Sequence, residues 1–315
     1  MKEFVIKEND ANQRVDKFIQ KTMKTMPKSL MYKYIRNKKI KVNNKRCEIS
    51  QRLACGDTMQ CYISEEFYEV EHKMDFLQVP STLHILYEDD ALLIVDKPKG
   101  LRAHRDSVDV QDNLADRILH YLYQQNLYDP KHSQSFTPAL CHRIDRNTKG
   151  IVIAAKTASA LRDMNEHIRN HEVHKYYVCI VEGHLANDTD HVILYHKKVD
   201  DNTADVIAYP KEGYKEMESA YRTIRREGKY ALLEVELMSG KSHQIRAMMA
   251  YLKAPLVGDV KYGAQKNGRS DYQQLWAYRI EFHFQKESSL SYLRDFQLQL
   301  DIDECITNFH NVIRK

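Results

Sequence analysis

The chain has 315 residues, of which 43% are hydrophobic and 29% are charged, a composition typical of a globular protein with one large and one small domain. No apolar run approaches the roughly 20 residues that span a bilayer, and residues 1–10 lack the apolar core of a signal peptide. The six cysteines form no C-x-x-C pair, which indicates reduced thiols. We therefore expect a cytoplasmic protein with no membrane partner.

The net charge of +4 is distributed unevenly along the chain. Residues 1–61 carry 15 Lys and Arg against 6 Asp and Glu, a balance of +9, whereas residues 62–315 have a balance of −5. A small basic segment beside a mildly acidic body is typical of a module that binds a polyanion. A Lys-rich helical surface that only contacts solvent would give the same balance, so charge alone leaves both interpretations open.

The basic segment predicts two helices followed by short strands. A helical stripe of apolar residues begins near Arg14 and includes Phe18. Pro27 suits the first turn of a second helix, whose buried face we expect to comprise Leu30, Tyr34 and Ile35. Residues 39–43 alternate like a strand, and residues 58–63 predict another strand after a Gly-Asp turn.

This order of elements resembles the alpha-L RNA-binding module, which occurs in a ribosomal small-subunit protein, a tyrosyl-tRNA synthetase and several RNA-modifying enzymes. The patterns R-V-D-K-F-I, Y-I-R-N-K-K-I-K-V-N-N-K and C-G-D carry the resemblance over residues 1–62. Lys28 and Ser29 stand where the module usually has Ser-Arg. The resemblance implies an RNA-binding surface, to which we assign Arg36, Lys38, Lys39 and Lys41.

Residues 63–80 include five acidic residues and end in a proline, so we predict a linker there and a second domain over residues 81–315. Because its strands outnumber its helices and short turns join several of them, we expect an α+β domain with a mixed, mainly antiparallel sheet. Strands are predicted at 83–87, 91–95, 151–155, 177–181, 192–195, 220–225, 230–237 and 276–284, and helices at 113–125, 158–168 and 243–252.

The strongest local signal is the run H-R-I-D-R-N-T-K-G at residues 142–150, directly before an apolar strand. Asp145 lies between Arg143 and Arg146 in this run. Nearby positive charge favours the ionised carboxylate, so Asp145 is better suited to act as a nucleophile or a base than as a proton donor. An ion-paired aspartate in a turn would show the same pattern, and charge alone favours that simpler interpretation.

The same run resembles the H-R-L-D-x-x-T-S-G motif of RluA-type pseudouridine synthases. Four further segments occur in the order of that family, one before this run and three after it: residues 94–101, 175–183, 239–246 and 255–263. They resemble the family's V-D-K-P-x-G-L, K-x-Y-x-A-x-V-x-G, T-G-R-x-H-Q-I-R and P-x-x-G-D-x-x-Y-G motifs, respectively. Because five ordered matches make chance similarity implausible, the chain is identified as a member of this family.

The resemblance implies a reaction and the residues that perform it. Asp145 corresponds to the aspartate required for breaking the glycosidic bond of a uridine and rejoining uracil through a ring carbon. Tyr177 corresponds to a tyrosine that packs against the base and is implicated in the final proton removal, and Arg246 to the basic partner of the aspartate. Arg143 corresponds to an arginine associated with displacing the flipped uridine. A core tyrosine and a phosphate-binding arginine are the simpler alternatives for Tyr177 and Arg246.

Three lysines within these motifs are predicted to contact RNA as well. Lys97 could contact a phosphate or could be an ordinary turn residue. Lys149 stands where the family usually has a serine, and Lys241 stands where arginine is common, which keeps the charge but loses the planar fork. We expect these two departures to affect the choice of RNA and not the activity.

The resemblance further implies a sheet in two halves with Asp145 in the cleft between them, and a monomer. The isomerisation is redox-neutral, and the sequence has no P-loop, no H-E-x-x-H and no zinc spacing, so we expect no cofactor and no metal. Structured RNA is the expected partner, with ribosomal RNA of the large subunit preferred over tRNA because RluA-type enzymes with this N-terminal module commonly act there. The rival from another class is a non-catalytic RNA-binding or ribosome-assembly factor.

Overall fold

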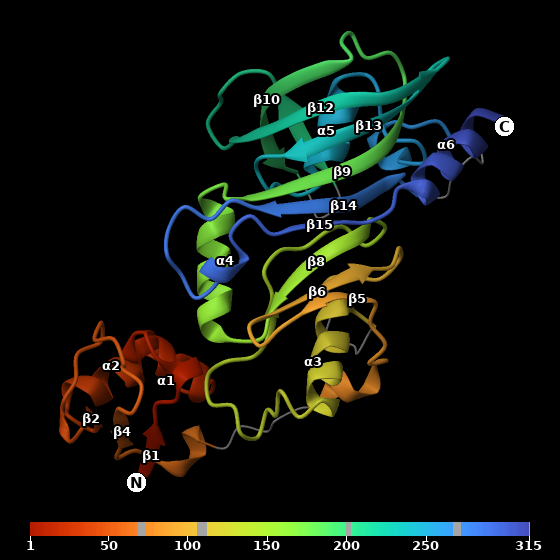
Figure 1. Ribbon diagram of the computed structural model, residues 1–315. Helices are drawn as coiled ribbons and strands as arrows, with labels where there is room; N and C mark the ends of the chain where they lie inside the picture. Colours follow the sequence, from red (N-terminus) through yellow and green to blue (C-terminus); the bar gives the residue numbers. More distant parts are fainter. Residues whose placement is uncertain (69–73, 106–111, 200–202, 267–271, 315) are drawn as a thin grey trace.

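The computed structural model describes residues 1–68, 74–105, 112–199, 203–266 and 272–314 (Figure 1). Part of the predicted linker, residues 69–73, lies outside the described residues. In the described part of the chain, no helix is both long and apolar enough to cross a membrane.

The N-terminal unit is a small sheet packed against two helices. Its strands pair in the order β1-β4-β2-β3, and it has its own hydrophobic cluster, which is separate from those of the large sheet. Its elements are β1 (Lys2–Val5), α1 (Val15–Thr22), α2 (Lys28–Arg36), β2 (Ile40–Val42), β3 (Lys45–Arg46) and β4 (Thr58–Cys61).

The buried face of α2 agrees with the predicted one only at Ile35. Pro27 is the residue before the helix and not part of its first turn, and Met31 and Ile35 are the residues that α2 buries. Tyr34 is only partly buried against the same cluster, and Leu30 is half-exposed. Met31 and Ile35 are four residues apart, which is the spacing that aligns side chains on one face of a helix.

The residues predicted as a linker are anchored at both ends by aromatic side chains. Phe67 and Tyr68 pack against the N-terminal cluster, and the hydroxyl of Tyr68 donates to the carbonyl of Cys61 at 3.0 Å. Phe76, by contrast, belongs to the cluster of the large sheet. Short 3-10 helices, Glu65–Phe67 and Asp75–Gln78, contain two of these anchors.

The rest of the chain forms an eleven-stranded sheet with the main order β11-β10-β12-β13-β9-β14-β8-β6-β5. All of its pairings are antiparallel except that of β14 with β8, which confirms the predicted α+β fold with a mainly antiparallel sheet. The strands are β5 (Ile85–Glu88), β6 (Leu92–Lys97), β7 (Ala139–Leu140), β8 (Lys149–Ala155), β9 (Val173–Glu182), β10 (Thr189–Lys198), β11 (Ala204–Ile207), β12 (Lys215–Glu227), β13 (Tyr230–Leu237), β14 (Leu275–Phe282) and β15 (Gln297–Gln299).

Helices cover both faces of this sheet. Residues alternate across it, so that Val152 of β8 belongs to the cluster under α3 (Leu114–Gln124) and α5 (Gln244–Tyr251), whereas Ile153 belongs to the cluster under α4 (Ala158–Arg169). The helix α6 (Asp303–Arg314) packs on a third cluster. Strands buried on both faces read as continuous apolar runs, which is why the sequence Ile151–Ala155 predicts a strand so clearly.

The two halves of the sheet meet where β8 pairs with β14. Only two residue pairs form this parallel contact, Trp276 with Lys149 and Ala277 with Gly150. Gly150 has a φ of +124°, and a Cβ at this position would lie 2.1 Å from the carbonyl oxygen of Ala277. The junction therefore requires glycine at position 150, at the end of the H-R-I-D-R-N-T-K-G run.

The N-terminal unit contacts the start of α4 through polar groups (Figure 1). The side-chain oxygen of Asn9 accepts from the backbone N–H of Ala158 at 2.9 Å, and Arg162 donates to the carbonyl of Ala11 at 3.1 Å. Asp10 accepts from both the N–H and the hydroxyl of Ser135. Polar contacts of this kind leave the hydrophobic clusters of the two units independent of each other.

Candidate active site

A cavity of about 760 Å³ opens at the junction of the two half-sheets. Its walls come from the turn before β8, from β9, from the end of β13 and from the first residues of α5 with the loop that precedes them. Five of the residues predicted from the sequence line this one cavity: Arg143, Asp145, Tyr177, Lys241 and Arg246.

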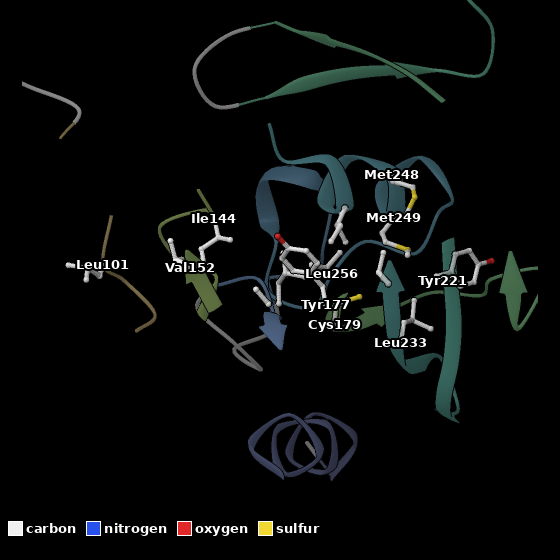
Figure 2. Close-up of a cluster of buried hydrophobic side chains, with 14 of the residues drawn as sticks. Leu101, Ile144, Val152, Tyr177, Cys179, Tyr221, Leu233, Met248, Met249 and Leu256 are labelled. Atoms are coloured by element: carbon white, nitrogen blue, oxygen red, sulfur yellow. The ribbon is translucent and has the colours of Figure 1, made fainter. Parts of the chain in front are cut away.

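Asp145 lies in the turn between β7 and β8, and its side chain is 27% exposed. The preceding residue, Ile144, is buried in the core and anchors the turn (Figure 2). The N–H of Thr148 donates to the carbonyl of Asp145 at 3.1 Å, which closes the turn. The carboxylate is thus presented to the cavity by a backbone that is fixed on both sides.

Lys97 supports this turn from the protein interior and does not reach the surface. Its side chain is fully buried, and its ammonium donates to the carbonyls of Pro98, Leu101 and Arg146 at 2.7–3.0 Å. Burial lowers the pKa of Lys97 to about 8, against the opposing charges of Asp145 and Asp96. The predicted phosphate contact of Lys97 is therefore wrong, because the side chain is committed to holding two chain segments together.

Arg246, on α5, contacts two carboxylates at once. Its Nη1 donates to Oδ2 of Asp145 at 3.0 Å, while Nε and Nη2 donate to Oδ2 and Oδ1 of Asp259 at 2.6 and 2.8 Å. Burial alone would lower the pKa of Arg246, but the two carboxylates raise it. Arg246 thus contacts Asp145 as expected, but its bidentate pair is with Asp259, which leaves one edge of the guanidinium to orient Asp145.

His243 lies beside this group and was not predicted as a site residue. Its Nε2 is 3.8 Å from Oδ2 of Asp145, and its Nδ1 is 3.1 Å from the hydroxyl of Tyr262. Burial lowers the pKa of His243, Asp145 raises it and Arg246 lowers it further. The backbone of His243 has a φ of +55°, an uncommon conformation that recurs at functional sites.

Tyr177, on β9, is almost completely buried in the main cluster, near Val152 and Leu256 (Figure 2). Burial raises the pKa of Tyr177, and the negative charge of Asp145 raises it further. The phenol is therefore neutral over the whole working range of pH. It offers the cavity an aromatic ring and a hydroxyl in the neighbourhood of Asp145.

Two further residues of the cavity, His142 and Lys175, carry groups that the sequence did not single out. Nε2 of His142 accepts from the backbone N–H of Ile153 at 3.2 Å, so the ring is neutral and its proton is on Nδ1. Burial lowers the pKa of His142 to about 3, and the charge of Lys175 contributes to this shift. Burial also lowers the pKa of Lys175.

The remaining predicted RNA contacts divide into exposed and engaged cations. Arg143 is exposed at the cavity, and Lys241 lines it half-buried. Lys149 does not line the cavity, because its ammonium pairs with Glu304 of α6 at 2.6 Å. The N-terminal cations differ among themselves: Arg36, Lys38 and Lys39 are exposed and Lys41 is half-buried.

Some of the residues missed from the sequence had a signal there. Asp259 and Tyr262 both lie in the segment 255–263, and His243 lies in the segment 239–246, so each motif carries more than one residue of the site. Within the described ranges, no group of three or more His, Cys, Asp or Glu side chains is arranged to hold a metal ion.

The chain is similar in sequence and in fold to known pseudouridine synthases. The family model "RNA pseudouridylate synthase" matches residues 91–251. An uncharacterized RNA pseudouridine synthase of Mycoplasma pneumoniae is 34% identical over 288 residues, 89% of this chain and 87% of that protein. The ribosomal large subunit pseudouridine synthase C of Vibrio cholerae is 30% identical over 266 residues, 83% of this chain and 80% of that protein.

Among solved structures, human RNA pseudouridylate synthase domain containing 4 matches with a TM-score of 0.57 at 18% identity, over 73% of this chain and 93% of that one. At this identity the match supports the fold of the large sheet. The family match and the relatives extend the similarity to the chemistry. The chain therefore belongs to the RNA pseudouridylate synthase family and is an isomerase that acts on RNA.

Proposed function

We propose that this enzyme converts uridine to pseudouridine in large-subunit ribosomal RNA, with Asp145 as its essential carboxylate. The proposed reaction is supported by the contacts from Asp259 through Arg246 to Asp145, at a cavity that Tyr177 also lines. The choice of RNA rests on the relatives named ribosomal large subunit pseudouridine synthase C in Vibrio and Buchnera. A tRNA substrate is the alternative.

The proposed roles follow from the geometry of the cavity. A uridine in a structured RNA must first leave its stack, at a cost of a few kcal/mol. Arg143, exposed at the cavity, is placed to occupy the vacated position, and the ring of Tyr177 offers the base an aromatic face. Both contacts would offset part of the cost of flipping.

Orientation of the carboxylate is the second requirement. The N1–C1′ bond of the uridine breaks, and a new bond forms between C1′ and a ring carbon of uracil. The proton that this ring carbon loses is balanced by one gained at N1. Arg246 holds Oδ2 of Asp145 at 3.0 Å, which fixes one oxygen and leaves the other directed to the substrate. Because Asp259 fixes Arg246 in turn, Asp145 is positioned by a group that cannot rotate freely.

We assign RNA affinity to the N-terminal unit, as an alpha-L-like module over residues 1–62 that a linker at 63–80 joins to a catalytic domain at 81–315. Its balance of +9 and its exposed cations support this assignment. The exposed Lys39 lies over the ring of Tyr34 at 5.3 Å and the half-buried Lys41 over that of Tyr62 at 5.4 Å, an association of charge and aromatic surface that suits RNA.

The test is to map pseudouridine in the total RNA of cells with and without the gene. We expect one or more sites in large-subunit ribosomal RNA to disappear without the gene and to return with the wild-type gene, but not with Asp145→Asn. Loss confined to tRNA would overturn the choice of substrate. No loss in any RNA, with normal binding of RNA, would favour a non-catalytic RNA-binding factor.

A further inference from the structure

Lys175 is a cation of the cavity that has no role in the mechanism above. Lys175 precedes Tyr177 by two residues on β9, so both side chains leave the same face of the sheet, about 7 Å apart along the strand. Both residues line the cavity. Any nucleotide whose base reaches Tyr177 therefore brings its sugar and phosphates within range of Lys175.

Lys175 is half-buried at the cavity wall, and its contacts differ from those of the buried cations of this region. Arg246 has two carboxylates and Lys97 has three carbonyls. Within the ranges that the structure describes, no hydrogen bond or ion pair joins the side chain of Lys175 to another residue. Burial lowers the pKa of Lys175, and no carboxylate opposes this effect.

The immediate surroundings do not supply the missing partner. His142, whose pKa is sensitive to the charge of Lys175, has its Nε2 engaged as an acceptor by the N–H of Ile153. The half-buried ammonium of Lys175 keeps only part of its hydration shell. A ligand that brings an anion into the cavity can supply the contacts that are lost.

RNA supplies one kind of anion, the phosphodiester, and supplies it once per nucleotide. We propose that Lys175 binds a backbone phosphate adjacent to the target uridine, as a subsite next to Tyr177. This contact sets how deeply the flipped nucleotide enters the cavity, and thus which atoms reach Asp145. The proposal rests on the proposed pseudouridine-forming reaction, for which it defines part of the substrate site.

The test combines variants of Lys175 with RNA in which single phosphates are neutral. A stem-loop containing the target uridine is prepared in three forms: unmodified, with a methylphosphonate 5′ to the uridine, and with a methylphosphonate 3′ to it. For the wild-type enzyme, we expect one of the two substitutions to weaken binding about tenfold or more, as for a lost hydrogen bond to a charged group.

Lys175→Gln should weaken binding of the unmodified RNA by a similar factor and should be insensitive to that same methylphosphonate. Its affinity should also fall less steeply with salt, by a slope of about 0.7, the value for one phosphate contact on a single strand. Lys175→Arg keeps a cation and should restore both the affinity and the sensitivity. Lys286→Gln, an exposed lysine outside the cavity, is the matched control and should behave as wild type.

Equal sensitivity of the wild type and Lys175→Gln to both methylphosphonates would overturn the proposal and leave Lys175 with a structural role. Thermal melting of each variant separates that result from misfolding, and the wild-type measurements stand even if Lys175→Gln does not fold. If the wild type binds the RNA with the expected sensitivity but forms no pseudouridine, the proposed substrate is wrong and the phosphate subsite is not. Binding and turnover are therefore measured separately.

Discussion

The N-terminal unit and the catalytic cavity are both rich in cations but hold them in opposite ways. Arg36, Lys38 and Lys39 are exposed on the N-terminal unit, where water and salt screen them. In the cavity, the side chain of Arg246 is 7% exposed and contacts two carboxylates. Exposed cations adapt to many phosphates, whereas a buried and paired cation keeps one direction. Affinity and orientation are thus served by different regions of the chain.

The largest expected effect comes from removing the charge that the cavity orients. Asp145→Asn should reduce pseudouridine formation below detection, because the neutral amide can act neither as nucleophile nor as base. The melting temperature should change by only a few degrees, about 1 kcal/mol, since Asp145 is 27% exposed and Arg246 keeps Asp259. Asp188→Asn, at an exposed aspartate, is the control. Measurable turnover by Asp145→Asn would exclude the essential role.

A smaller loss of activity is expected when Arg246 is replaced by lysine, which keeps the positive charge but not the planar guanidinium. Lysine cannot contact Asp259 with two nitrogens and Asp145 with a third. Arg246→Lys should therefore lower kcat about 100-fold, as expected for a misplaced catalytic group, while RNA affinity changes less than about threefold. Arg222→Lys alters an ion pair between the exposed Arg222 and the buried Glu234, neither of which lines the cavity, and should leave kcat unchanged. Parallel losses of affinity and kcat would indicate that Arg246 contacts phosphate instead.

Deleting residues 1–68 tests whether the N-terminal unit supplies RNA affinity. This deletion also removes Phe67 and Tyr68, which would otherwise be exposed without the N-terminal cluster. Affinity should fall, and the slope of its logarithm against that of salt concentration should flatten by roughly 3 if the four assigned N-terminal cations each contact one phosphate. The remaining chain should fold, because its hydrophobic clusters include no residue of the N-terminal unit.

A short RNA at high concentration should still be modified slowly by the deleted protein. Equilibrium binding across a salt series, with the full chain as the reference, measures the change of slope. An unchanged slope would mean that the basic face only contacts solvent. RNA would then be held by the catalytic domain alone.

The smallest effect concerns a histidine whose charge state the cavity fixes. The pKa of His142 is about 3 in the folded protein and about 6.5 when unfolded, so acid protonates the unfolded chain first. Stability from this group is present above pH 6.5 and is lost as the pH falls toward 3. At pH 5 the loss should be about 2 kcal/mol relative to pH 7. His142→Gln keeps an acceptor for the N–H of Ile153 and should lose less stability on acidification.

Urea unfolding of the wild type and His142→Gln at pH 7 and pH 5 measures this difference. His132→Gln, at a histidine whose side chain is 82% exposed, is the control and should follow the wild type. An identical response of all three proteins would contradict the assignment of a neutral His142.

The sequence predicts the buried centres of the strands better than their ends. The strand predicted at 230–237 matches β13, whereas β9 begins at Val173, four residues before the prediction, because its first residues are mostly half-exposed and polar. The helix α6 was not predicted, and neither was β1. The packing partners of both elements lie far away in the sequence, β9 and β13 for α6 and β4 for β1, so the contacts that stabilise them are not encoded locally.

The active site, too, could be predicted from the sequence only in part. The sequence motifs predict Asp145, Tyr177 and Arg246 as site residues, and all three line one cavity in the structure. The pairing of Arg246 with Asp259 and the burial of Lys97 could not be read from the motifs. Each depends on which of several neighbouring charges a side chain meets after folding. Spacing along the chain does not encode that choice.

The position of β14 has a consequence for the order in which the enzyme folds. β8 and β9 are separated by a single helix in the sequence, yet β14, which starts at Leu275, lies between them in the sheet. The hairpins β5–β6 and β12–β13 can form early, since short connections join their strands, but β14 pairs with both β9 and β8, and the contact of Gly150 with Ala277 closes a loop of more than a hundred residues. The cavity is lined from both sides of this contact, so we expect it to be completed late. A nascent chain would then carry its exposed cations well before it has a site in which to use them.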